Sequence, residues 1–86
     1  MTILHEPENT FVIEKLWAFV SRDEKGNEGL VAAPLSGMMM PMIAADKDRL
    51  ESLKPIAKDI AKMTKQKIVL LEFSTKKEVE VIDGID

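Results

Sequence analysis

One segment of this sequence has the spacing of a long amphipathic helix, and it separates two stretches that favour strands. From Lys47 to about Lys65, apolar residues recur every three or four positions and share one face, as in a helix that packs on a core. Asp46 precedes the segment, and an aspartate there can cap the free amides of the first turn. Pro55 lies inside it, but the apolar face continues across the proline, so we predict one kinked helix. The predicted core face consists of Leu50, Leu53, Ile56, Ala57, Ile60, Ala61 and Met63.

The chain before this helix has the pattern of strands joined by a hairpin loop. Residues 10–21 are rich in β-branched and aromatic side chains and contain a continuous apolar run. A helix over the same residues is the alternative, because several of the apolar side chains also share a helical face. The polar, glycine-containing stretch at 23–27 and the second apolar run at 30–33 favour strand, loop and strand. A short third strand at 38–44 would lie at a sheet edge, since Pro41 has no backbone donor.

Two further strands are expected after the helix. Residues 67–73 are mostly apolar and β-prone, and residues 78–82 alternate acidic with apolar side chains. Residues 74–77 would form the turn between them. The order of elements is then β-β-(β)-α-β-β. It predicts an α+β fold, with a small antiparallel sheet of four to five strands and the long helix packed on one face.

Length and composition place the chain among small intracellular domains. The 86 residues suffice for one domain, which we assign to residues 10–86, after a polar, flexible N-terminal arm at residues 1–9. The chain contains no cysteine, whereas small secreted domains usually depend on disulfides. Its first residues do not have the order of a signal peptide, and no apolar run is long enough for a membrane span. We therefore expect a cytoplasmic protein with no membrane association.

The side chains needed for common active sites and metal sites are missing from the sequence. The single histidine, His5, falls in the expected N-terminal arm, where it cannot be held against a substrate. One histidine without cysteine cannot form a zinc site, and the loop at 23–28 has its glycine at the wrong position for a calcium loop. The four glycines match neither a dinucleotide fingerprint nor a P-loop. We expect no enzymatic activity, no cofactor and no metal.

A methionine-rich segment is the most unusual feature of the sequence. It comprises Met38, Met39, Met40, Met42 and Ile43, next to Gly37 and Pro41. Flexible methionines can fill an irregular gap in a core, and they can also form an adaptable contact surface for a partner or for a second copy. A third interpretation is a methionine-lined pocket for a small molecule. We treat the five residues as a candidate interface.

A basic stripe runs along the predicted helix beside its apolar face. An acidic protein or a phosphate backbone could bind there. The alternative is a hydrated helix face whose lysine stems cover apolar surface. Arginine, which binds phosphate more specifically, is absent from the stripe, and no aromatic side chain lies near it for base stacking. The candidate basic patch consists of Lys47, Lys54, Lys58, Lys62 and Lys65.

These features predict a small non-enzymatic protein-interaction or regulatory module rather than a catalyst. We expect it to form a homodimer through residues 38–43 or through a sheet edge, and a different protein partner is the other option. The alternative function is nucleic-acid binding by the lysine stripe. The third is small-molecule binding in a methionine-lined pocket. No residue motif ties the chain to a known family, and the sequence leaves any partner unidentified.

Overall fold

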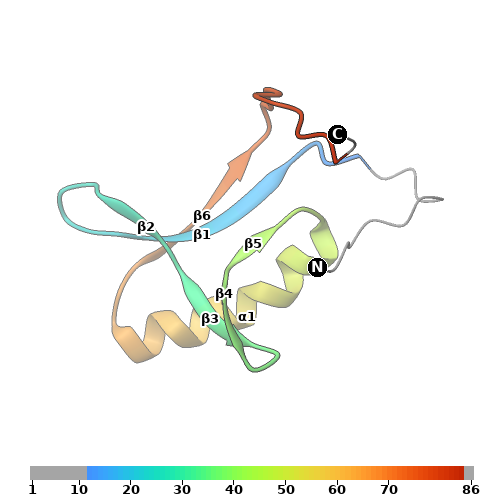
Figure 1. The fold of residues 1–86 in the computed structure, drawn as a ribbon. Helices are drawn as coiled ribbons and strands as arrows, with labels where there is room; N and C mark the ends of the chain where they lie inside the picture. Colours follow the sequence, from blue (N-terminus) through green and yellow to red (C-terminus); the bar gives the residue numbers. More distant parts are fainter. Residues whose placement is uncertain (1–11, 85–86) are drawn as a thin grey trace.

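The computed structural model describes residues 12–84 and has the α+β fold that the sequence predicts (Figure 1). The predicted arm at residues 1–9 lies outside the described residues. A small antiparallel sheet, a separate two-stranded ribbon and one helix make up the described part. The elements in chain order are β1 (Leu16–Arg22), β2 (Glu28–Leu30), β3 (Ala32–Leu35), β4 (Met38–Pro41), β5 (Ile43–Ala44), α1 (Lys47–Thr64) and β6 (Ile68–Phe73).

β1 is the central strand of the sheet, and all of its partners are antiparallel. β6 pairs with it along one edge, from Leu16 opposite Phe73 to Ser21 opposite Ile68. The other edge is shared, because β2 pairs with the end of β1 and β5 pairs with its beginning. The continuous apolar run within residues 10–21 is therefore the central strand of the sheet. Residues 12–15, for which the sequence left strand and helix open, form neither.

Two sharp bends take the chain out of this sheet and back into it. Val31 is the single residue between β2 and β3, and Met42 is the single residue between β4 and β5. Their backbones form a cycle with Phe19 of β1: the Phe19 amide donates to the Met42 carbonyl, the Val31 amide to the Phe19 carbonyl, and the Met42 amide to the Val31 carbonyl. All three side chains are buried. The β3–β4 hairpin consequently starts from a rigid junction and leaves the main sheet.

The helix closes the core on one side of the sheet. Asp46 caps it as predicted, with its Oδ1 atom accepting a bond of 2.7 Å from the Arg49 amide. The helix runs through Pro55 as one element. Most of its predicted core face is buried or half-buried, but Met63 is 82% exposed, because the last turn leads out of the core into the connection to β6. The buried core contains Trp17, Phe19, Val31, Ala33, Met42, Ala44, Leu50, Leu53 and Ala57.

The two faces of the main sheet differ in what lies over them. Side chains alternate along β1, so Trp17 and Phe19 point toward the helix. Their partners on β6, Glu72 and Leu70, lie on that same face. The opposite face carries β1 residues of even number and their β6 partners, and it is also apolar. Both the helix and the β3–β4 hairpin lie on the first side (Figure 1). The residues of β1 and β6 on the second face are Leu16, Ala18, Val20, Val69, Leu71 and Phe73.

The predicted last strand at residues 78–82 is absent from the structure. Residues 74–84 have no regular secondary structure, and Val79, Val81 and Ile82 are exposed. The physical reason is the path of the chain after β6. Lys76 Nζ donates to the Ile13 carbonyl at 3.2 Å, so the tail runs beside residues 12–15 instead of turning back along β6. A strand needs hydrogen bonds to a neighbouring strand, and among the described residues β6 pairs with β1 and with no strand at 78–82.

Candidate interaction surfaces

The β3–β4 hairpin is built by a two-residue turn that fixes its register. Ser36 has φ 51° and Gly37 has φ 80°, and positive φ at both central residues is what a type I′ turn requires. Such a turn matches the natural twist of two strands, so the hairpin forms without a longer loop. Leu35 opposite Met38 is the first pair after the turn. The hairpin therefore presents its side chains in one defined arrangement.

Prolines occupy both outer edges of this hairpin. In an antiparallel ribbon, alternate pairs exchange backbone hydrogen bonds, starting with the pair beside a two-residue turn. The bond from the Met42 amide to the Val31 carbonyl confirms this alternation. Pro34 and Pro41 consequently fall at positions whose backbone points away from the partner strand. Because proline has no N–H, each edge lacks a donor there, and a further strand pairs poorly with it. The edge position predicted for Pro41 is confirmed, whereas the matching position of Pro34 was not predicted.

The methionine-rich segment is divided between surface and core. Met38 is 68% exposed, Met39 67% and Met40 40%, whereas Met42 is completely buried at the strand junction. Ile43 is half-buried and pairs with Ala18 within the main sheet. Met42 therefore fills the core, and the exposed part of the candidate interface is confined to the hairpin. We call the exposed Pro34, Met38, Met39, Met40 and Pro41 the hairpin surface.

The hairpin surface is free of charge over an unusual length of chain. No Asp, Glu, Lys or Arg occurs from Gly29 to Ala45, and Ser36 supplies the only side-chain hydroxyl. Charged side chains on edge strands are a common protection against association, and this hairpin has none. Its surface offers apolar contact area and no group for acid–base chemistry. The missing charges are readable in the sequence, although only the structure shows which of these residues are exposed.

The predicted lysine stripe is not one continuous site. Lys47, Lys62 and Lys65 are exposed at the two ends of the helix. Lys54 is half-buried and forms an ion pair of 2.9 Å with Glu51, one turn earlier. Lys54 and Lys58 alone line a groove between the helix and the main sheet. These two lysines therefore stand apart from the rest of the stripe.

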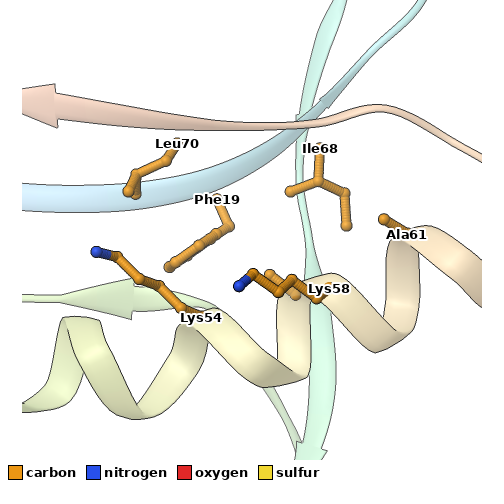
Figure 2. Close-up of a pocket in the computed structure, with 7 residues that line it drawn as sticks. Phe19, Lys54, Lys58, Ala61, Ile68 and Leu70 are labelled. Atoms are coloured by element: carbon orange, nitrogen blue, oxygen red, sulfur yellow. The ribbon is translucent and has the colours of Figure 1, made fainter.

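This groove is apolar with a basic rim. It holds about 250 Å³ and is open to solvent along its length. Figure 2 shows Phe19, Ile68 and Leu70 pointing from the strands toward the helix, with Lys54 and Lys58 extending from the helix toward them. Leu70 remains 39% exposed beside this groove. The residues that line the groove are Phe19, Lys54, Ala57, Lys58, Ala61, Ile68 and Leu70.

Two polar arrangements that could resemble functional sites have structural roles instead. Trp17 donates its indole N–H to Glu72 at 3.0 Å, which supplies the partner that a buried tryptophan needs. In the β1–β2 loop, Asp23 accepts bonds from the backbone amides of Lys25 and Asn27, both at 2.9 Å. The side-chain amide of Asn27, followed by these backbone amides, lowers the pKa of Asp23 below its usual 3.8. Both carboxylates hold strands or loops in place.

Among residues 12–84, no three acidic or histidine side chains come together as metal ligands. No helix in this part of the chain combines the length and the apolar character needed to cross a membrane. The chain matches no known protein family, no characterised protein and no solved structure. Function therefore has to be argued from the hairpin surface, the groove and the sheet edges.

Proposed function

We propose that this protein is a small interaction module that self-associates through the hairpin surface. The observation that carries the proposal is the exposure of Met38, Met39 and Met40 on a rigid, uncharged hairpin. Grouped apolar side chains on a small protein usually mark a contact site, whereas scattered ones do not. Methionine suits such a site because its unbranched side chain adapts to the opposing surface.

A second copy is the occupant that best fits this surface. A twofold contact places the same patch on both partners, so the patch has to be complementary to itself. Two uncharged patches meet without like-charge repulsion, and apolar burial favours their contact at about 25 cal/mol per Å². The prolines prevent the hairpin edges from extending into an open-ended sheet. Contact through side chains with blocked edges is compatible with a closed dimer.

Replacing Met39 and Met40 together with glutamate tests this function. The expected result is a lower mass in light scattering than that of the wild type, because the hairpin contact would then bury carboxylates that repel those of the second copy. Both side chains are exposed, so the far-ultraviolet circular dichroism spectrum should remain that of the wild type. Met63→Glu is the matched control: Met63 is also highly exposed, but it lies at the far end of the helix, and its replacement should leave the dimer intact.

The outcome that contradicts the proposal is a wild-type protein that remains monomeric at ~100 μM, well above the dissociation constants of ordinary standard-size interfaces. Equal loss of the dimer in the Met63→Glu variant would also contradict it, because the effect would then follow added charge rather than the hairpin surface.

A further inference from the structure

The outer edge of β6 carries backbone groups that no described strand pairs. Phe19 directs its amide and carbonyl toward β2 and β5, so the odd-numbered residues of β1 face that side. The even-numbered residues of β1 therefore bond β6, through their partners Val69, Leu71 and Phe73. It follows that Ile68, Leu70 and Glu72 direct their N–H and C=O groups outward. Within residues 12–84, β6 pairs with β1 alone.

This edge lacks the protection that the hairpin has. Residues 68–73 include neither proline nor glycine, and their side chains favour strands. An edge with unpaired backbone groups and apolar side chains is a template for adding another strand. Strand addition uses the backbone for affinity and the alternating side chains for specificity, so the chemistry on the two faces of β6 identifies a suitable segment.

The two faces of β6 differ in charge. On the helix side, Ile68 and Leu70 line the groove beside the basic rim of Lys54 and Lys58 (Figure 2). Glu72 also lies on this side, but it accepts the Trp17 indole N–H and does not line the groove. On the other side, Val69 and Leu71 belong to an apolar face. A segment that fits both faces would alternate acidic residues, directed toward the lysines, with apolar residues directed toward the second face. Paired strands place opposite side chains on the same face, so the alternation has to be strict.

We propose that this edge binds residues 78–82 of a second copy as an added strand. The segment reads Glu78-Val79-Glu80-Val81-Ile82; its first four residues have the required alternation, and Ile82 ends it. When Glu78 and Glu80 face the lysines of the groove, Val79 and Val81 extend the apolar face beside Val69 and Leu71. The same two valines are among the most exposed side chains of the described residues. Strand addition would bury them.

The path of the tail favours exchange between copies over a hairpin within one chain. The bond from Lys76 to the Ile13 carbonyl continues the direction of β6 past the start of β1. Residues 13 and 76 stand in the register that already pairs Leu16 with Phe73. The tail therefore leaves beside the start of β1, away from the outer edge of its own β6, and extends to where a second copy can bind it. This exchange uses a surface separate from the hairpin surface and does not rest on that contact.

Charge reversal on each side, followed by mixing, tests the exchange. Lys54→Glu with Lys58→Glu makes the groove acidic, and Glu78→Lys with Glu80→Lys makes the tail basic. The Met39→Glu, Met40→Glu background removes the hairpin contact, so association in sedimentation equilibrium then reports the β6 edge alone. In this background we expect a dimer as long as the charges of the groove and of the tail are not reversed. Either reversal alone should weaken it about tenfold or more, because like charges then face each other.

An equal mixture of the two reversed variants should recover the dimer. In the mixed pair, the acidic groove of one chain meets the basic tail of the other, and the remaining groove and tail keep their original charges. Glu80→Pro should also abolish association without changing the monomer's circular dichroism spectrum, because in an antiparallel pairing residues 78 and 80 lie opposite the outward-facing residues of β6 and donate to them. The control Glu24→Lys with Lys25→Glu, in the β1–β2 loop, should leave the dimer unchanged.

Three results would overturn the proposal. One is a monomer in the Met39→Glu, Met40→Glu background before any charge is reversed. Another is a mixture of the two reversed variants that stays monomeric although opposite charges then meet at both contacts. The third is a Glu80→Pro variant that dimerises like its parent. Since the hairpin contact is absent from this background, none of these results depends on the proposed function.

Discussion

The β3–β4 hairpin and the β6 strand are both apolar and exposed, but they offer opposite kinds of contact. The hairpin presents methionine side chains, while Pro34 and Pro41 remove backbone donors from both of its edges. β6 presents unpaired backbone groups, and much of its apolar surface is half-buried by its neighbours. The hairpin is therefore suited to contact between side chains, and β6 is suited to pairing with a strand. Although both surfaces are apolar, they are therefore not equivalent as contact sites.

The largest effect expected for the hairpin is a difference in stability between variants at Met42 and at Met39, three positions apart. Met42→Ala should lower the free energy of unfolding by about 2–5 kcal/mol, because it deletes a completely buried side chain at the strand junction. Met39→Ala should change it by less than about 0.5 kcal/mol, since that side chain is mostly exposed. Urea unfolding of both variants measures the difference. Similar losses at the two sites would show that the hairpin surface is part of the core.

A smaller effect should follow from changing the turn of the hairpin. Gly37 has φ 80°, and a Cβ atom built there meets nothing within 4 Å. The cost of Gly37→Ala is therefore backbone strain alone, about 1–2 kcal/mol. Thermal unfolding checks this value, and Gly84→Ala, which also has open space and no positive φ, is the control. An unchanged melting temperature in Gly37→Ala would contradict the type I′ turn.

For β6, the corresponding stability test concerns Glu72, which accepts the Trp17 indole N–H. Glu72→Ala leaves that donor without its partner and should cost about 1 kcal/mol. Glu80→Ala should leave the stability of the monomer unchanged, because Glu80 lies in the exposed tail. Chemical unfolding at low protein concentration measures both. A larger cost at Glu80 than at Glu72 would mean that the tail, and not β6, holds this end of the sheet.

The smallest effect is expected for nucleic acids. Lys54 and Lys58 face an apolar groove, and the remaining stripe lysines lie at the two ends of the helix. We expect no binding to labelled single-stranded or duplex DNA or RNA tighter than ~100 μM at ~50 mM salt, where phosphate contacts are strongest. Fluorescence anisotropy checks this. Tighter binding that disappears when Lys54, Lys58, Lys62 and Lys65 are changed to glutamate would favour the phosphate-binding alternative.

The parts of the fold that the sequence predicted depend on local patterns. The helix, its cap at Asp46 and the strands at β1 and β6 follow from spacing and composition within a few residues. The junction at Val31 and Met42 could not be predicted, because it depends on backbone bonds to Phe19, which is distant in sequence. The alternation at residues 78–82 was a sound sign of strand preference. It could not show whether a neighbouring edge exists within the same chain.

The methionine-rich segment could be predicted as a candidate interface. Which of its residues are exposed and which are buried could not. Met38, Met40 and Met42 share the same side of their strand, yet their exposed fractions fall from 68% to 40% to 0% as the strand approaches the junction. Alternation cannot produce such a gradient, since it treats the three positions alike. In the same way, the spacing of the five lysines could not show that Lys54 and Lys58 alone line the groove. Both distinctions arise from where the sheet and the helix meet.

Hydrogen exchange of single backbone amides, followed by NMR at low and high protein concentration, tests the contrast between these two surfaces most directly. At low concentration the amides of Val69, Leu71 and Phe73 should exchange slowly, because they bond β1, and those of Ile68, Leu70 and Glu72 should exchange fast. At high concentration we predict that Ile68, Leu70 and Glu72 become protected, while the Met39 amide stays fast because the hairpin binds by side chains alone. Protection of Met39 without any slowing along β6 would contradict this division of roles.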